Sequence, residues 1–144
     1  MAKDVSLFSG MTRMQSTYLR YHHSDKVVFY LGGYANRFQR DFIKKIYKDN
    51  PDINYEHFGD IDAGGLWIHH NLCEITGVKF KMIYMSINEL NNPHYKSCIH
   101  ELTENDVLRL QKLCEIDEYK KVVEYMLENN LKLEQEIISL DLMS

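Results

Sequence analysis

The chain has 144 residues, of which 44% are hydrophobic and 26% are charged, and its formal net charge is −4 at pH 7. This length suits one compact domain, and the composition excludes both a disordered tail and a uniformly basic protein that coats nucleic acid. The three cysteines are odd in number and widely spaced, and no apolar run is long enough to span a bilayer, so we expect a cytoplasmic protein with reduced thiols and no membrane contact.

Strand patterns alternate with helix patterns in the first part of the chain. Four runs of β-branched, aromatic or alternating apolar residues predict strands: 5–8, 26–33, 54–58 and 78–85. Three segments with apolar residues at helical spacing predict helices: 11–23, 36–51 and 65–77. This alternation is typical of parallel strands that are joined by helices.

Some of these segments carry more detailed expectations. The second strand should be buried and should end in a tight turn at Gly32 and Gly33. The second helix should begin at Asn36, its N-cap, and the third helix should end at Gly77. Four apolar residues should lie on one side of the second helix: Phe38, Phe42, Ile43 and Ile46.

The last part of the chain is expected to be helical. A loop is predicted over 86–100. Three helices should follow it: 102–114, 117–130 and 131–143. The first of these opens with Thr103 and Asp106 at the spacing of a capping box. The predicted fold is therefore α/β, with a small, mostly parallel sheet flanked by helices and a helical C-terminal part.

Two aspartates follow the strand over 54–58. Residues i and i+2 of an extended chain project to the same side, so Asp60 and Asp62 should converge. Their mutual repulsion favours a hard divalent cation, Mg²⁺ or Mn²⁺, because such ions prefer carboxylate and water oxygens. Ligands of open α/β sheets bind at the carboxyl ends of the strands. We therefore predict a metal site here; the alternative is that Asp62 only caps the next helix.

Three glycines flank this pair of aspartates. Gly59, Gly64 and Gly65 have no side chain that would keep a phosphate or a second strand away. We expect them to line the same site, unless they only form the turn.

A basic stripe lies on the predicted helix over 36–51. It consists of Arg37, Arg40, Lys44 and Lys48, at a spacing that places them on one side of the helix. Such a stripe can neutralise DNA phosphates, although a solvated helix face is the alternative. His57 is a further candidate for a phosphate contact, because it directly precedes the acidic motif.

Several blocks of the sequence resemble a known family. The segment FGDIDAGG, between a strand and a helix, is similar to the Asp-x-Asp motif of TOPRIM domains in topoisomerases and primases. Four blocks in the same order resemble the C-terminal TOPRIM-like domain of the JetD family of Wadjet plasmid-defence systems: YLGGY (30–34), HFGDIDAGGLWIHHNL (57–72), LTENDVLRL (102–110) and LEQE (133–136). The resemblance covers most of the chain from Lys26 onward.

This resemblance implies a fold related to the TOPRIM region of topoisomerase VI and a Mg²⁺-dependent cleavage of DNA. It also implies that the protein acts within a complex that contains condensin-like motor proteins. Asp60 and Asp62 match the catalytic, metal-binding aspartates of the family, and Gly59, Gly64 and Gly65 match the flanking glycines. Two residues, Glu134 and Glu136, match the terminal block, whose role is not assigned.

One departure leaves the function open. TOPRIM domains carry a glutamate at the end of the first strand, whereas Ser9 and Gly10 take those positions here. The alternatives to a metal-dependent endonuclease are a degenerate, non-catalytic interaction module and a phosphoryl-transfer or nucleotide enzyme. We expect residues 1–144 to form a single TOPRIM-like domain, as a fragment or remnant of a larger protein, and we leave its oligomeric state open.

Overall fold

The computed structural model describes residues 4–8 and 26–144, so the predicted helix over 11–23 and the positions of Ser9 and Gly10 lie outside the described residues. Within the described residues, four parallel strands form one sheet in the order β2-β1-β3-β4. Their bounds are β1 Asp4–Phe8, β2 Lys26–Tyr30, β3 Tyr55–Phe58 and β4 Lys81–Met82. The predicted small, parallel sheet is therefore confirmed.

The register of the sheet places the ends of the strands side by side. The Cα partners of Phe8, the last residue of β1, are Tyr30 of β2 and Phe58 of β3. The carboxyl ends of these three strands therefore meet at one edge of the sheet. Asp60 follows Phe58 by two residues, so the acidic motif starts at this edge.

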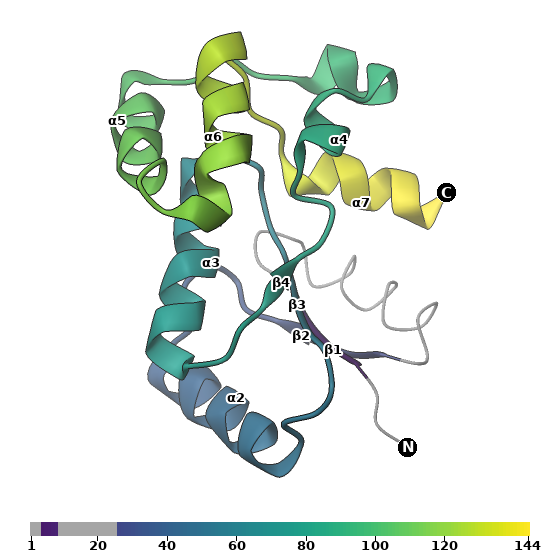
Figure 1. Cartoon of the computed structure of the whole chain (residues 1–144). Helices are drawn as coiled ribbons and strands as arrows, with labels where there is room; N and C mark the ends of the chain where they lie inside the picture. The colour runs from purple at the N-terminus through teal and green to yellow at the C-terminus, as the bar shows by residue number, and fades with distance from the viewer. Residues whose placement is uncertain (1–3, 9–25) are drawn as a thin grey trace.

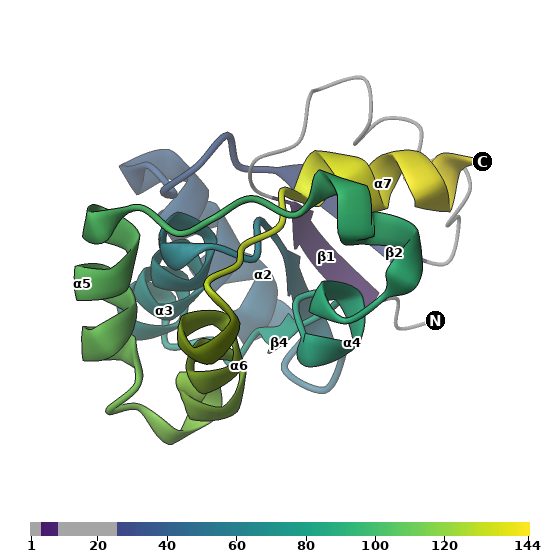
Figure 2. The ribbon, with the colours of Figure 1, turned by 90° about the horizontal axis from the view of Figure 1, so that it is seen from above.

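Helices surround the sheet and make up the C-terminal part, as predicted. Their bounds are α2 Arg37–Asp49, α3 Ala63–Thr76, α4 Ile87–Leu90, α5 Glu104–Leu113, α6 Asp117–Asn129 and α7 Gln135–Met143, with the 3₁₀ helix η1 at Pro93–Cys98. Helices α2 and α3 lie on one side of the sheet and α7 lies on the other (Figures 1 and 2). None of the described helices is both long and apolar enough to cross a bilayer.

Two apolar clusters hold these layers together. The cluster under α2 and α3 contains Val5, Leu31, Ile43, Tyr55, Leu72, Val78 and Phe80. The larger cluster joins the end of β3 and the start of α3 to α5 and α6, and its most buried members include Phe58, Ile61, Leu66, Leu110, Leu113 and Met126. The acidic motif contributes Ile61 to this second cluster, so the loop that carries the aspartates is anchored in the core.

Helix termini follow the predicted caps. Asn36 opens α2, and its side chain and that of Gln39 exchange hydrogen bonds with each other's backbone. Thr103 and Asp106 form the same kind of box at the start of α5. Gly77 ends α3 with a φ of 69°, a left-handed conformation that favours glycine.

The predicted burial of the second strand was wrong, and the apolar side of α2 is covered only in part. Strand β2 lies at the edge of the sheet, and Val27 and Tyr30 are each 41% exposed. On α2 only Ile43 is buried, whereas Phe42 is 50% and Phe38 is 87% exposed. The physical reason is the narrow sheet: among the described residues it ends at β2, so Phe42 packs on Phe29 of this edge strand and no described strand lies further out to cover Phe38.

Three predicted boundaries were also wrong. The predicted loop over 86–100 contains α4, which is opened by a Ser86–Glu89 capping box, and then η1. The strand predicted over 78–85 pairs only at Lys81–Met82. The last helix begins at Gln135 rather than at residue 131, because the preceding residues form bridges with two distant segments.

Candidate functional site

The acidic motif is held extended between β3 and α3. Ile61 forms an antiparallel bridge with Leu133, with N···O distances of 2.9 and 3.1 Å. Asp62 has φ −144° and ψ 177°, which is extended backbone, and it is the N-cap of α3. The segment before α7 therefore fixes the path of the chain between the two aspartates.

Asp60 is oriented by the start of α7. The backbone N–H of Gln135 donates to Asp60 Oδ1 at 2.7 Å. The side chain of Gln135 is fully buried, and its Nε2 donates to the carbonyl oxygen of Phe58 at 2.9 Å. One residue of α7 thus binds both the last residue of β3 and the first aspartate.

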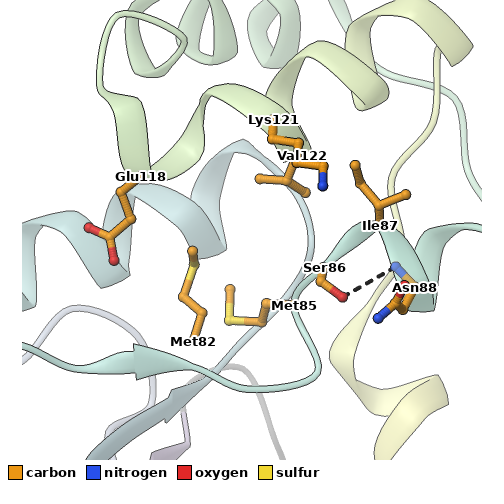
Figure 3. A pocket seen from close by; sticks show the side chains of 8 residues that line it. All are labelled: Met82, Met85, Ser86, Ile87, Asn88, Glu118, Lys121 and Val122. Carbon is orange, nitrogen blue, oxygen red and sulfur yellow. Dashed lines mark hydrogen bonds between the residues drawn. The ribbon is translucent and has the colours of Figure 1, made fainter.

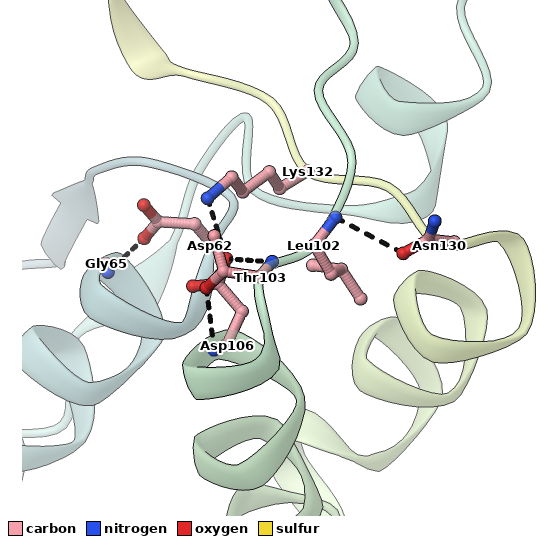
Figure 4. A network of polar contacts seen from close by, with 7 residues as sticks. All are labelled: Asp62, Gly65, Leu102, Thr103, Asp106, Asn130 and Lys132. Carbon is pink, nitrogen blue, oxygen red and sulfur yellow. Dashed lines mark hydrogen bonds and ion pairs between the residues drawn. The ribbon is translucent and has the colours of Figure 1, made fainter.

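Asp62 is oriented by its own helix. The backbone N–H of Gly65 donates to Asp62 Oδ1 at 2.6 Å (Figure 4). The helix cap that was the alternative to a metal role is therefore present. In both aspartates the backbone N–H binds Oδ1. Across residues 4–8 and 26–144, Oδ2 of neither aspartate has a hydrogen bond or an ion pair. The cap consequently leaves a carboxylate oxygen available for a ligand.

The electrostatic environment of Asp60 is unfavourable to its charge. The pKa of Asp60 is raised to about 6, chiefly by burial and also by the negative charges of Asp62, Glu134 and Glu136, while the hydrogen bond from the Gln135 N–H acts to lower it. The two glutamates of the terminal block therefore lie close enough to act on Asp60, although both are exposed. A bound cation at this position would relieve the repulsion.

The flanking glycines have different local roles. A Cβ on Gly65 would lie 2.0 Å from the carbonyl oxygen of Asp60, so only glycine fits there. A Cβ on Gly64 would lie 3.3 Å from Asp62 Oδ1, which is tight but not excluded. The N–H of Gly59 is buried and contacts Met85 Sδ at 3.2 Å. The close packing of α3 against the loop explains the glycine at position 65 without a ligand.

His57 does not lie at the surface of the site. It is fully buried, and burial lowers its pKa to about 3. Its ring lies 5.4 Å from the ring of His69, which is also buried and bonds to Tyr119 and to the carbonyl oxygen of Phe80. The prediction that His57 contacts a DNA phosphate is therefore wrong for this structure, because the side chain points toward α3 and away from solvent.

The basic stripe of α2 runs away from the acidic motif. Arg37, Lys44 and Lys48 are exposed, and Arg37 forms a loose ion pair with Asp41 at 3.9 Å. Helix α2 leads from the carboxyl end of β2 back to the start of β3. From Arg37 to Lys48 the stripe extends about 16 Å along the axis of this helix, because the rise is about 1.5 Å per residue. Only its first residues are near the carboxyl edge of the sheet. A contact of Arg37, Arg40, Lys44 and Lys48 with DNA stays a prediction.

Three of the four sequence blocks meet around the acidic motif. Lys132 Nζ lies 2.7 Å from Asp106 Oδ2, and Asp106 in turn holds the backbone N–H of Thr103 (Figure 4). The residue after Lys132 pairs with Ile61, and two residues further on Gln135 binds Asp60. The blocks at 57–72, 102–110 and 133–136 therefore form one connected polar network.

Two residues of this network, Gln135 and Lys132, and the neighbouring Met85 were not predicted from the sequence. Gln135 stands inside the LEQE block, in which the two glutamates are the residues that carry charge. No local sequence pattern indicates the contacts of Lys132 and Met85, because their partners, Asp106 and Gly59, are distant in the chain. The spacing of acidic residues alone does not predict which amides orient them.

A separate pocket of about 260 Å³ lies between α6 and the segment from β4 to α4 (Figure 3). Its apolar wall includes Met82, Met85 and Val122, and Glu118 and Lys121 stand at its rim. No predicted site residue lines this pocket. Met85 is nevertheless shared, because its sulfur contacts the N–H of Gly59 on the other side.

The fold and the site define an α/β domain in which an acidic loop follows a central parallel strand. The family of the Wadjet protein JetD, C-terminal, matches residues 14–144, and the chain belongs to that family. The resemblance seen in the four sequence blocks is thereby confirmed, and it connects the chain with a multi-protein defence system. No curated protein matches the chain.

Proposed function

We propose that the chain is the Mg²⁺-binding, TOPRIM-like catalytic domain of a DNA-cleaving Wadjet-type plasmid-defence protein. One observation carries this proposal: two neighbouring carboxylates at the carboxyl end of β3 are each oriented by a backbone N–H and each keep a second oxygen. Membership in the JetD C-terminal family supports the assignment to a defence protein.

The chain's own residues fit such an ion in part. In the described part of the chain, no group of three or more His, Cys, Asp or Glu side chains is arranged to hold a metal. The two aspartates offer one oxygen each, which suits Mg²⁺ because this ion usually keeps several water ligands and binds through one or two carboxylates plus phosphate. When bound, it would supply charge stabilisation and orientation for the oxygens of a phosphodiester.

The remaining parts of the site have supporting roles in this proposal. The Gly65 N–H and the Gln135 N–H keep the two carboxylates in place. The first residues of the α2 stripe, Arg37 and Arg40, would neutralise phosphates of DNA that approaches the carboxyl edge. DNA and the motor proteins of the defence complex are the partners that the proposal requires.

A non-catalytic interaction module is the second candidate. The observation that favours it is Ser9 in the place of the family's first-strand glutamate, which would leave the metal with fewer carboxylate ligands. The two candidates differ in whether a divalent cation binds at the acidic motif at all.

Titration calorimetry with Mn²⁺ tests the proposal. We expect one binding event in the wild type and its loss in Asp60→Asn and in Asp62→Asn, which keep the shape of the side chain. Nicking of supercoiled plasmid with Mg²⁺ or Mn²⁺, wild type beside the same variants, then tests cleavage. Absence of Mn²⁺ binding would favour the non-catalytic module, whereas binding without nicking but with phosphate release from a nucleotide would favour phosphoryl transfer.

A further inference from the structure

We infer that Gln135 is a positioning residue for Asp60, acting through its backbone N–H and holding that carboxylate in the orientation in which it would bind a metal ion. This inference rests on the proposed metal role of Asp60. It assigns a function to the terminal LEQE block, in which the glutamine, rather than either glutamate, makes the direct contact.

The geometry gives Gln135 two anchors at one place. Its N–H binds Asp60 Oδ1 at 2.7 Å and its Nε2 binds the Phe58 carbonyl oxygen at 2.9 Å, so it spans the strand end and the aspartate. Two residues earlier, Leu133 is bridged to Ile61 through both backbone groups. The start of α7 therefore has little freedom to move relative to the acidic loop.

The side chain of Gln135 is not explained by packing alone. It is fully buried, and within the described residues its Oε1 has no hydrogen-bond donor. A buried oxygen without a donor destabilises the folded state, and an apolar side chain of similar size would avoid this. The bond from Nε2 to Phe58 offers the reason for an amide at this position.

The hydrogen bond to Oδ1 fixes how the Asp60 carboxylate is turned. The N–H occupies one of the lone pairs of this carboxylate, and Oδ2, which has no hydrogen bond within the described residues, stays available to a cation in a fixed orientation. Without the N–H, the carboxylate could rotate in the metal-free protein, and binding of the ion would have to fix its orientation. Hydrogen bonds to a charged acceptor are among the stronger ones in proteins.

A pair of substitutions at one position separates the N–H from the side chain. Gln135→Pro removes both, whereas Gln135→Ala removes only the side chain. Proline suits this position, because Gln135 is the first residue of α7 and the preceding Glu134 has φ −77° and ψ 138°. The two variants therefore differ chiefly in the hydrogen bond to Asp60.

Calorimetric titration with Mn²⁺ should show that Gln135→Pro binds at least about tenfold more weakly than Gln135→Ala, because a hydrogen bond to a charged group corresponds to about that factor. Their melting temperatures without metal give the accompanying control for folding. Equal Mn²⁺ affinity in the two variants would overturn the inference. If wild-type protein binds no Mn²⁺, the proposed function fails instead.

A second measurement leaves Gln135 unchanged and needs no metal. Hydrogen exchange of the Gln135 amide, followed by NMR, should be at least about tenfold faster in Asp60→Ala than in the wild type, because the acceptor has been removed. The amide of Gly65, whose N–H donates to Asp62 Oδ1, is the internal control and should exchange at the same rate in both proteins. An unchanged rate at Gln135 would exclude the contact and with it the positioning role, even if Gln135→Pro does not fold.

Discussion

The backbone N–H of Gln135 binds Asp60 Oδ1 at 2.7 Å although the two residues are 75 positions apart in the chain. The strand, loop and helix that carry the aspartates are local, since they follow one another from Tyr55 to Thr76. The hydrogen bond that orients the first aspartate comes instead from the start of α7, and so do two of the negative charges that act on it, those of Glu134 and Glu136. The acidic motif is therefore complete only when the C-terminal part has folded onto it.

Replacement of Gly65 tests how closely α3 packs on the loop. Gly65→Ala should lower the free energy of unfolding by about 3 kcal/mol or more, because the new Cβ would lie 2.0 Å from the Asp60 carbonyl oxygen and the backbone would have to move. Gly64→Ala is the matched control. Its free energy of unfolding should stay within about 1 kcal/mol of that of the wild type, because the higher helix propensity of alanine offsets the tight contact with Asp62 Oδ1. Urea denaturation measures both, and equal stabilities would contradict the packing.

Two substitutions of Asp62 separate its cap from its charge. Asp62→Ala removes the acceptor for the Gly65 N–H and should lower the free energy of unfolding by about 1 kcal/mol. Asp62→Asn keeps an acceptor oxygen, so its stability should stay within about 0.5 kcal/mol of wild type. If Asp62 also binds metal, both variants should lose Mn²⁺ affinity in calorimetry. Normal affinity in Asp62→Asn would leave Asp62 as a helix cap only.

Much of the fold follows from local signals in the sequence. Side-chain caps at Asn36 and Thr103 and the glycine at position 77 predict where helices begin or end, because these residues satisfy backbone groups within a few positions. Exposure of Phe38 was not predictable in the same way. Helical spacing says which residues share a side, but the width of the sheet decides how much of that side is covered.

The candidate site was predictable to a similar extent. The positions of Asp60 and Asp62 at a strand end follow from the order of strand and helix patterns. Strand alternation predicts the burial of His57 only if it is known which face of the sheet the helices cover. In the structure its ring lies on the face that α3 covers, next to the ring of His69. The contact of Gln135 with Asp60 depends on tertiary structure, and no spacing in the sequence encodes it.

His57 should make the protein sensitive to acid. Its pKa is lowered from 6.5 to about 3 in the folded state, so below pH 6.5 the unfolded chain takes up a proton that the folded protein does not. The free energy of unfolding should therefore fall by about 2–3 kcal/mol between pH 6.5 and pH 4.5 through this residue. Urea denaturation across this range should show a shallower loss in His57→Gln than in wild type. Parallel curves would contradict the prediction, and the same substitution at the exposed His100 serves as the control.

Asp60 should act on stability in the opposite direction. Its pKa is raised from 3.8 to about 6 in the folded protein, chiefly by burial, so the folded state holds a proton between these values that the unfolded chain has lost. The free energy of unfolding should therefore rise as the pH falls from 7 toward 4, and fall as the pH rises through 6. With solvent screening allowed for, this change is about 2 kcal/mol at most.

The comparison with Asp60→Asn isolates this effect of Asp60, because all other titrating groups are common to both proteins. Relative to Asp60→Asn, the wild type should become more stable as the pH falls from 7 to 4, with most of the change between pH 6 and pH 4. Urea denaturation of both proteins in metal-free buffer measures the difference. A wild type that loses stability relative to Asp60→Asn on acidification would mean that the Gln135 N–H outweighs burial and the neighbouring carboxylates. The charge of Asp60 would then be stable without a cation, and the electrostatic reason to expect a metal at this strand end would be gone.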